Sequence, residues 1–227
     1  MKDTIFKTIM WKENRIFFKS CFPICILYFG MELYFFLNNI SNVLFINEDL
    51  LRGQLFTFTC VNIALVGSLV SNLNMGFDLK AKILPVLLGM TKKKEIIWLA
   101  KTIYSFIVGV AFSFIGIVAM IFTYSKKGNL NNIMSDFEYI LAGVIIGLAF
   151  ITINMFFLWI IKYEIIMTLI SLILPVVLIV TIVNLIDYIQ KLSFIVIGIT
   201  TIISIALIFG SVFLIKKIPN SLFVDKV

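Results

Sequence analysis

The chain has 227 residues, of which 61% are hydrophobic and only 14% are charged, and its mean hydropathy is +1.10. A soluble domain carries charge on about a quarter of its residues because its surface faces water, so this composition excludes an ordinary soluble globule and predicts an all-α integral membrane protein. The net charge of +7 comes from cations grouped in short segments between apolar runs, which argues against nucleic-acid binding. With no histidine in the chain, a Cys/His zinc site is excluded and we expect no metal.

Residues 1–19 are predicted to form an amphipathic helix. One arc of its helical wheel contains the apolar side chains Ile5, Phe6, Ile9, Met10, Ile16 and Phe17, and the opposite arc contains Lys7, Lys12, Arg15 and Lys19. We expect this helix to lie in the membrane interface, with the apolar arc toward lipid and the cations toward anionic headgroups. Glu13 falls within the apolar arc and interrupts the pattern. A plain cytosolic extension of the first span is the alternative.

Six further stretches are long and apolar enough to cross a bilayer, whose core needs about 20 residues of helix. Together they occupy residues 20–215, as spans 20–38, 51–73, 98–124, 139–161, 165–186 and 192–215. Cytosolic loops of membrane proteins carry an excess of Lys and Arg. Fifteen of the 19 basic residues fall on one side of this arrangement, which contains both ends of the chain. The pattern therefore predicts an N-in/C-in protein of six transmembrane helices with a cytosolic tail, 216–227.

The cytosolic connection between the second and third spans, residues 76–95, is unusual. Its centre, residues 83–90, is too apolar for a loop in water and too short to span a bilayer, and lysines flank it on both sides. Such a segment lies in the interface, forms a re-entrant loop, or docks as a helix in a groove on a cytosolic partner. Pro85 suits the first turn of a short helix, and Gly89 suits its end.

These features resemble the permease subunits of ABC-2 type exporters. In that family an amphipathic helix precedes the first span, as the segment 11–19 does here. A mixed-charge stretch, Leu-x-Pro-Leu-type residues, a basic or polar turn, a Glu-Ile pair and a lysine inside the next span then join the second and third spans. The matching residues are Asp78, Lys80, Leu84, Pro85, Leu87, Thr91, Lys92, Lys93, Glu95, Ile96 and Lys101. The match by motif covers residues 1–20 and 76–102. Many members carry Gly-Thr where this chain has Lys82-Ile83.

The resemblance implies a transport subunit that docks through a short coupling helix onto a cytosolic ATP-binding-cassette ATPase. The docking residues would be Asp78, Lys80, Ile83, Leu84, Pro85, Leu87, Leu88, Met90, Thr91, Lys92, Lys93 and Glu95. The chain has no G-x-x-x-x-G-K-[ST] phosphate loop, so ATP and Mg²⁺ are expected on the partner and no cofactor or enzymatic activity in this chain. A second permease copy, identical or related, would complete the path.

The same resemblance implies a multi-pass protein of the bacterial plasma membrane that exports an amphipathic peptide or other hydrophobic cargo. Small permeases of this kind resemble those that export antimicrobial peptides or protect the cell from them. Two alternatives stay open: a membrane immunity or assembly protein that transports nothing, and the substrate-capture subunit of a vitamin importer. The coupling segment is not expected in the capture subunit.

Ionisable and polar residues within spans usually face protein or a water-filled path. The candidates are Glu32, Arg52, Asn62, Lys101 and Asn154. Glu32 and Arg52 are predicted to form an ion pair near the outer face, Lys101 to extend to the cytosolic headgroups, and the asparagines to bond between helices. Small residues that recur every four positions predict close helix packing. They are Ser105, Gly109 and Ser113 in the third span and Gly143 and Gly147 in the fourth.

Overall fold

The computed structural model describes residues 2–42, 48–91, 93–125, 133–160 and 194–218, with single positions between 166 and 181. The elements are α1 (Lys2–Ile16), the π-helical turn η1 (Phe17–Cys21), α2 (Phe22–Asn42), α3 (Glu48–Lys80), α4 (Ile83–Thr91), α5 (Lys94–Ser125), α6 (Ile133–Ile160) and α8 (Phe194–Lys217). Every element in these ranges is helical, which confirms the all-helical prediction for this part of the chain. The expected fifth span, 165–186, falls mostly outside the described residues.

Three of the described helices are long and apolar enough to cross a membrane. The qualifying segments are Gly53–Lys80 of α3, Lys94–Phe122 of α5 and Phe137–Ile160 of α6, which contain or overlap the predicted second, third and fourth spans. Helices α2 and α8 overlap the predicted first and sixth. At the end where α4 joins α3 to α5, both helices continue beyond the predicted spans, since α3 ends at Lys80 and α5 begins at Lys94.

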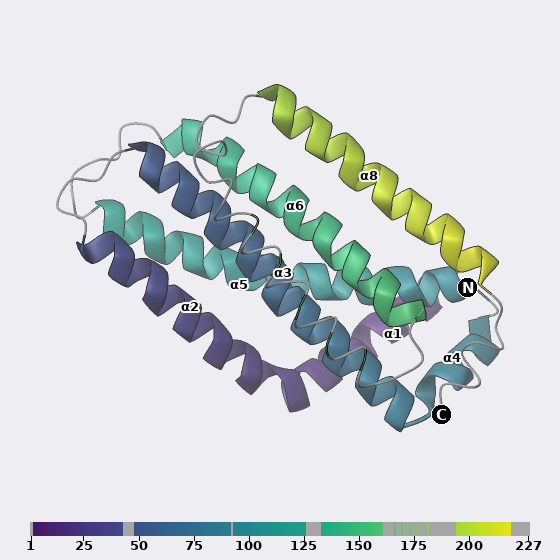
Figure 1. Cartoon of the computed structure of the whole chain (residues 1–227). Coiled ribbons are helices and arrows are strands. Elements are labelled where there is room, and N and C mark those ends of the chain that lie inside the picture. The colour runs from purple at the N-terminus through teal and green to yellow at the C-terminus, as the bar shows by residue number, and fades with distance from the viewer. Residues whose placement is uncertain are drawn as a thin grey trace.

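Helix α3 lies at the centre of the bundle (Figure 1) and packs against α5, α6 and α2. Helix α8 packs on the side of α6 away from α3, and α1 crosses the end of the bundle beside α5. Helices α3 and α6 run in the same direction, since Gly143 faces Thr59 and Gly147 faces Ile63. Helix α5 runs opposite to both.

The small residues in α5 and α6 lie where these helices meet α3. A Cβ on Gly109 would lie 3.0 Å from the carbonyl oxygen of Ile63, and a Cβ on Gly147 would lie 2.7 Å from Ile63 Cγ2. In α5, Ser105 shares a 2.8 Å hydrogen bond with Ser71, and Ser113 donates to the Thr59 carbonyl at 3.4 Å. Because small side chains let backbones approach closely, α3 is held tightly between its two neighbours.

Helix α1 is amphipathic, but its apolar arc faces the protein and not the lipid, contrary to the sequence expectation. Ile9 is buried in the main core cluster beside Trp98, and Phe17, at the start of η1, is buried in a second cluster with Tyr104. The outward side of α1 carries exposed cations together with Trp11, whose ring lies 5.7 Å from the Arg15 guanidinium carbon. The apolar arc thus secures α1 to the bundle.

We expect Gly109→Leu to lower the free energy of unfolding by about 1–3 kcal/mol, because the added side chain overpacks a contact with the α3 backbone. Gly198→Leu in α8 is the matched control, since a Cβ there meets no atom within 4 Å. Thermal unfolding of the purified protein in detergent measures both variants. Equal stability of the two would contradict the packing described for α3 and α5.

Candidate functional site

Helix α4 follows α3 after a two-residue turn. The Ala81 N–H donates to the Phe77 carbonyl at 2.9 Å, the Lys82 N–H donates to the Leu79 carbonyl at 3.1 Å, and Lys82 has a φ of 53°. A left-handed residue in this position is a common way to end an α-helix, although glycine is the usual choice. The chain therefore leaves α3 sharply, and Asp78 and Lys80 belong to α3 and not to the short helix.

One side of α4 is anchored to the bundle. Leu84 is 0% exposed and lies in the main core cluster with Ile97 and Trp98, and Leu87 and Leu88 pack against the same cluster. Pro85 lies in the first turn of α4, as predicted. The side chains of Met90, Thr91 and Lys92 lie outside the described residues. Leu84 therefore holds α4 in place and is not available for docking.

The opposite side of α4 is exposed. Val86 is 60% exposed, and Lys82, Gly89 and Lys93 are also exposed. These four positions are a lysine directly before α4, two exposed residues within it and a lysine two residues after its end. We call them the α4 outer face: an apolar centre with a lysine at either end.

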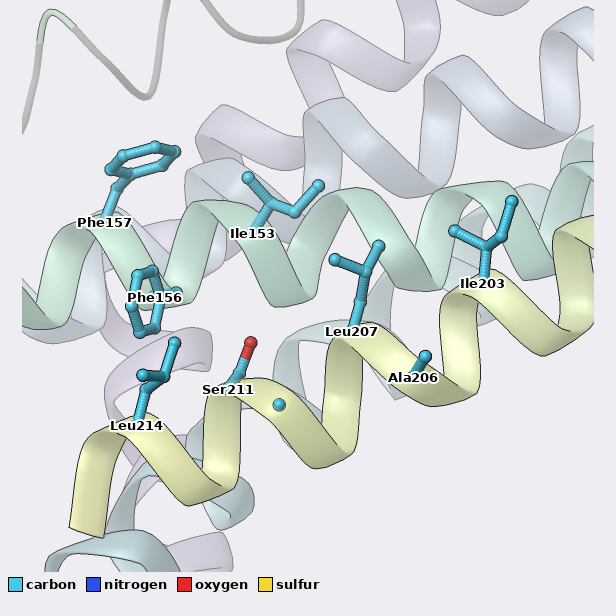
Figure 2. A pocket seen from close by; sticks show the side chains of 9 residues that line it. Ile153, Phe156, Phe157, Ile203, Ala206, Leu207, Ser211 and Leu214 are labelled. Atoms are coloured by element: carbon cyan, nitrogen blue, oxygen red, sulfur yellow. The ribbon is translucent and has the colours of Figure 1, made fainter. Parts of the chain in front are cut away.

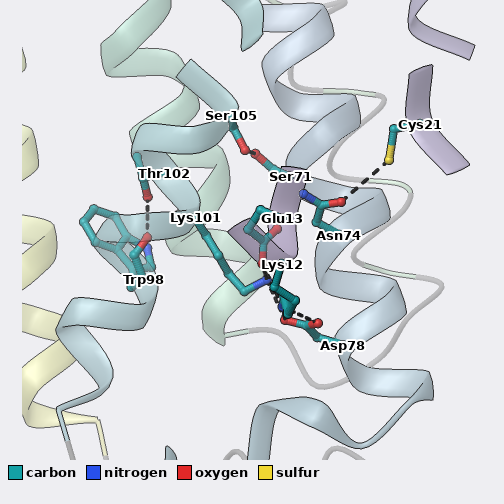
Figure 3. Close-up of polar contacts among 10 residues, drawn as sticks. All are labelled: Lys12, Glu13, Cys21, Ser71, Asn74, Asp78, Trp98, Lys101, Thr102 and Ser105. Carbon is teal, nitrogen blue, oxygen red and sulfur yellow. Dashed lines mark hydrogen bonds and ion pairs between the residues drawn. The ribbon is translucent and has the colours of Figure 1, made fainter. Parts of the chain in front are cut away.

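Four charged side chains from three helices form a cluster (Figure 3) of which all but Lys12 are buried: Lys12 and Glu13 from α1, Asp78 from α3 and Lys101 from α5. The Lys101 ammonium lies 2.8 Å from Glu13 Oε1 and 2.6 Å from Asp78 Oδ2. The Lys12 ammonium lies 2.8 Å from Glu13 Oε1 and 2.5 Å from Asp78 Oδ2. Each carboxylate thus contacts both lysines, and the four charges sum to zero.

The cluster corrects the expectations for its members. Lys101 is 2% exposed and pairs inside the protein, so it does not extend to the headgroups. Asp78 is 0% exposed, so it is not part of a docking surface. Glu13, which interrupts the apolar arc of α1, is 1% exposed and provides one of the two anions. The sequence contained two signals of this cluster, a carboxylate on an apolar arc and a lysine inside a span, because such groups need partners when they are buried.

Polar contacts beside the cluster join α1, η1, α3 and α5. The Cys21 thiol donates to Asn74 Oδ1 at 3.6 Å between η1 and α3. The Tyr104 hydroxyl donates to Asn14 Oδ1 at 3.1 Å between α5 and α1. Together with the bond between Ser71 and Ser105, these contacts fix the position of α1 relative to both long helices at the end where α4 begins.

The other predicted polar sites are dispersed. Asn62 in α3 and Asn154 in α6 are both fully buried, and neither side-chain amide has a hydrogen-bond partner within the described structure. The side chains of Glu32 and Arg52, and therefore their predicted ion pair, lie outside the described residues. Glu95 is half-buried in the first turn of α5, and the neighbouring Lys94 ammonium donates to the Ile218 carbonyl beyond α8.

The acidic side chains of the cluster are engaged by lysines, and within the described ranges no three His, Cys, Asp or Glu side chains come together as metal ligands. Comparison of the chain with models of protein families, with curated proteins and with solved structures finds no match. The candidate functional features are two at one end of the bundle, the α4 outer face and the buried charge cluster.

We expect Asp78→Asn to lower the free energy of unfolding by about 3–5 kcal/mol, because it leaves Lys12 and the buried Lys101 with one carboxylate between them. Glu95→Gln, a neutralised carboxylate outside the cluster, should cost about 1 kcal/mol or less. The double variant Asp78→Asn/Lys101→Gln restores charge balance and should be more stable than the sum of its single changes predicts. Thermal unfolding in detergent tests this, and strictly additive losses would contradict the coupling.

Proposed function

We propose that this chain is the transmembrane permease subunit of an ATP-binding-cassette exporter, with six spans, both ends in the cytosol, and a separate ATPase subunit. The observation that carries the proposal is the α4 outer face. An exposed apolar side chain between two lysines, on a short helix fixed to the protein on its other side, suits insertion into a groove of a cytosolic partner.

The dimensions of α4 favour a coupling role. Its nine residues extend about 14 Å along a helix axis, at about 1.5 Å per residue, which is too short to cross a bilayer core of about 30 Å. It joins α3 directly to α5, two of the helices that are long and apolar enough to span a membrane. A displacement of α4 by a partner would therefore act on both helices at once.

Some residues of this region would contact the ATPase, and others would hold α4 in position. Val86 would fill an apolar groove on the ATPase, and Lys82 and Lys93 would meet acidic side chains at its rim. Leu84 and the charge cluster would transmit the movement, because they tie α4, α3, α5 and α1 into one unit. ATP and Mg²⁺ would be bound by the partner, and a second permease copy would complete the path for an amphipathic peptide or other hydrophobic cargo.

The proposed orientation can be tested by accessibility. The native residues Cys21, Cys25 and Cys60 are all fully buried, so Val86→Cys should be the main site of reaction with a membrane-impermeant maleimide. We expect labelling in inside-out vesicles and not in intact cells, because α4 would face the cytosol. Thr8→Cys, at an exposed position of α1, should be labelled in the same way. Labelling of both sites from outside would contradict the orientation.

Docking can be tested by co-purification with an ATP-binding-cassette ATPase, and one encoded by a neighbouring gene would be the first candidate. We expect Val86→Asp to reduce ATPase recovery at least tenfold, because a carboxylate would be buried in an apolar groove. Val86→Thr keeps the shape of the side chain and should lose far less, and Thr8→Asp adds the same charge at an exposed position of α1. Wild-type ATPase recovery with Val86→Asp would overturn docking through α4. Absence of any ATPase with the wild type would favour a membrane protein that transports nothing.

A further inference from the structure

A groove of about 430 Å³ lies between α6 and α8 (Figure 2). Its size falls within the range of about 300–1,000 Å³ typical of ligand sites. The lining comes from two helices: Ile153, Phe156 and Phe157 of α6, and Ile203, Ala206, Leu207, Gly210, Ser211 and Leu214 of α8. Ser211 provides the only polar side chain among these nine. The groove can therefore bury an apolar chain but offers almost no hydrogen bonds.

Small residues of α8 open this groove while the helices stay in contact on either side of it. A Cβ on Gly210 would meet no atom within 4 Å, so the space beside it is open. Toward the start of α8, the Ser204 hydroxyl donates to the Ile145 carbonyl at 3.3 Å. Toward its end, Ile215 is fully buried in the main core cluster with Leu158 and Trp159. The groove is thus a fixed feature of the α6–α8 contact.

A positive charge lies at one end of the groove. The last turn of α8 carries Lys216 and Lys217, which are both exposed. Lys217 follows Gly210 and Leu214 at helical spacing, so it continues the face that lines the groove. Its ammonium lies 4.4 Å from the centroid of the Phe213 ring. The α8 end also meets Lys94 at the start of α5, so this is the lysine-rich end of the bundle.

We propose that the groove binds an anionic phospholipid, with one acyl chain between α6 and α8 and the phosphate at Lys216 and Lys217. An acyl chain needs no hydrogen bonds, whereas the backbone of a peptide in this groove would leave polar groups without partners, at a cost of several kcal/mol each. The negative phosphate complements the two lysines, and anionic lipids attract basic segments at the cytosolic leaflet. The inference does not depend on the proposed transport function.

The test measures retention of lipid by the purified full-length protein in detergent, using native mass spectrometry. The probes are phosphatidylglycerol and phosphatidylcholine with identical acyl chains. Gly210→Leu fills the groove, and Gly198→Leu adds the same side chain in open space elsewhere on α8. Lys216→Gln/Lys217→Gln removes the charges, and Lys7→Gln/Lys19→Gln removes one exposed charge from α1 and one from η1.

We expect the wild type to prefer phosphatidylglycerol, since each lysine near an anionic headgroup contributes about a fivefold gain in binding. Gly210→Leu should lose retention of both lipids, and Lys216→Gln/Lys217→Gln should lose only the preference for phosphatidylglycerol. The two control variants should match the wild type. Lipid retention by Gly210→Leu equal to that of Gly198→Leu would overturn the site. An unchanged preference for phosphatidylglycerol in Lys216→Gln/Lys217→Gln would also overturn the site. The same holds if Gly210→Leu changed only the oligomeric state of the protein.

Discussion

The close approach of α3 to α5 and α6 is the constraint on which the rest of the structure depends. Ile63 lies between Gly109 on one side and Gly147 on the other, so α3 cannot slide along either neighbour without a clash. This contact fixes the axial register of the helices and therefore decides which polar side chains meet at their ends. A shift of one turn, about 5.4 Å, would exceed the reach of the ion pairs between Asp78 and the lysines.

The charge cluster explains why α1 turns its apolar arc inward. Glu13 lies on that arc, and in lipid it would be an unpaired buried carboxylate at high cost. Turned toward the bundle, the same side chain meets Lys101, whose other carboxylate partner among the described residues is Asp78. Lys12 then completes the balance of charge. The interruption in the amphipathic pattern is thus the feature that determines the orientation of α1.

Sequence reasoning succeeded where the relevant interactions repeat along one helix. The spacing of Ser105, Gly109 and Ser113 predicts a face of small residues because each position depends only on helical periodicity. It could not reveal that Glu13 meets Lys101, since the pairing joins residues far apart in sequence. The continuation of α3 beyond residue 73 could not be predicted for the same reason, because Asn74 and Asp78 find their partners in other helices.

Two exposed apolar surfaces at the lysine-rich end differ in shape, and this difference favours different occupants. The α4 outer face has the exposed Val86 as its centre, which is the feature that the proposed docking into a groove of a folded protein uses. The surface between α6 and α8 is itself a groove whose lining provides one hydroxyl, that of Ser211, so it suits a flexible chain without polar groups. A folded partner can satisfy its own backbone hydrogen bonds before it docks, whereas an extended peptide in the groove cannot. Curvature and hydrogen-bonding capacity together therefore favour protein at α4 and lipid at α8.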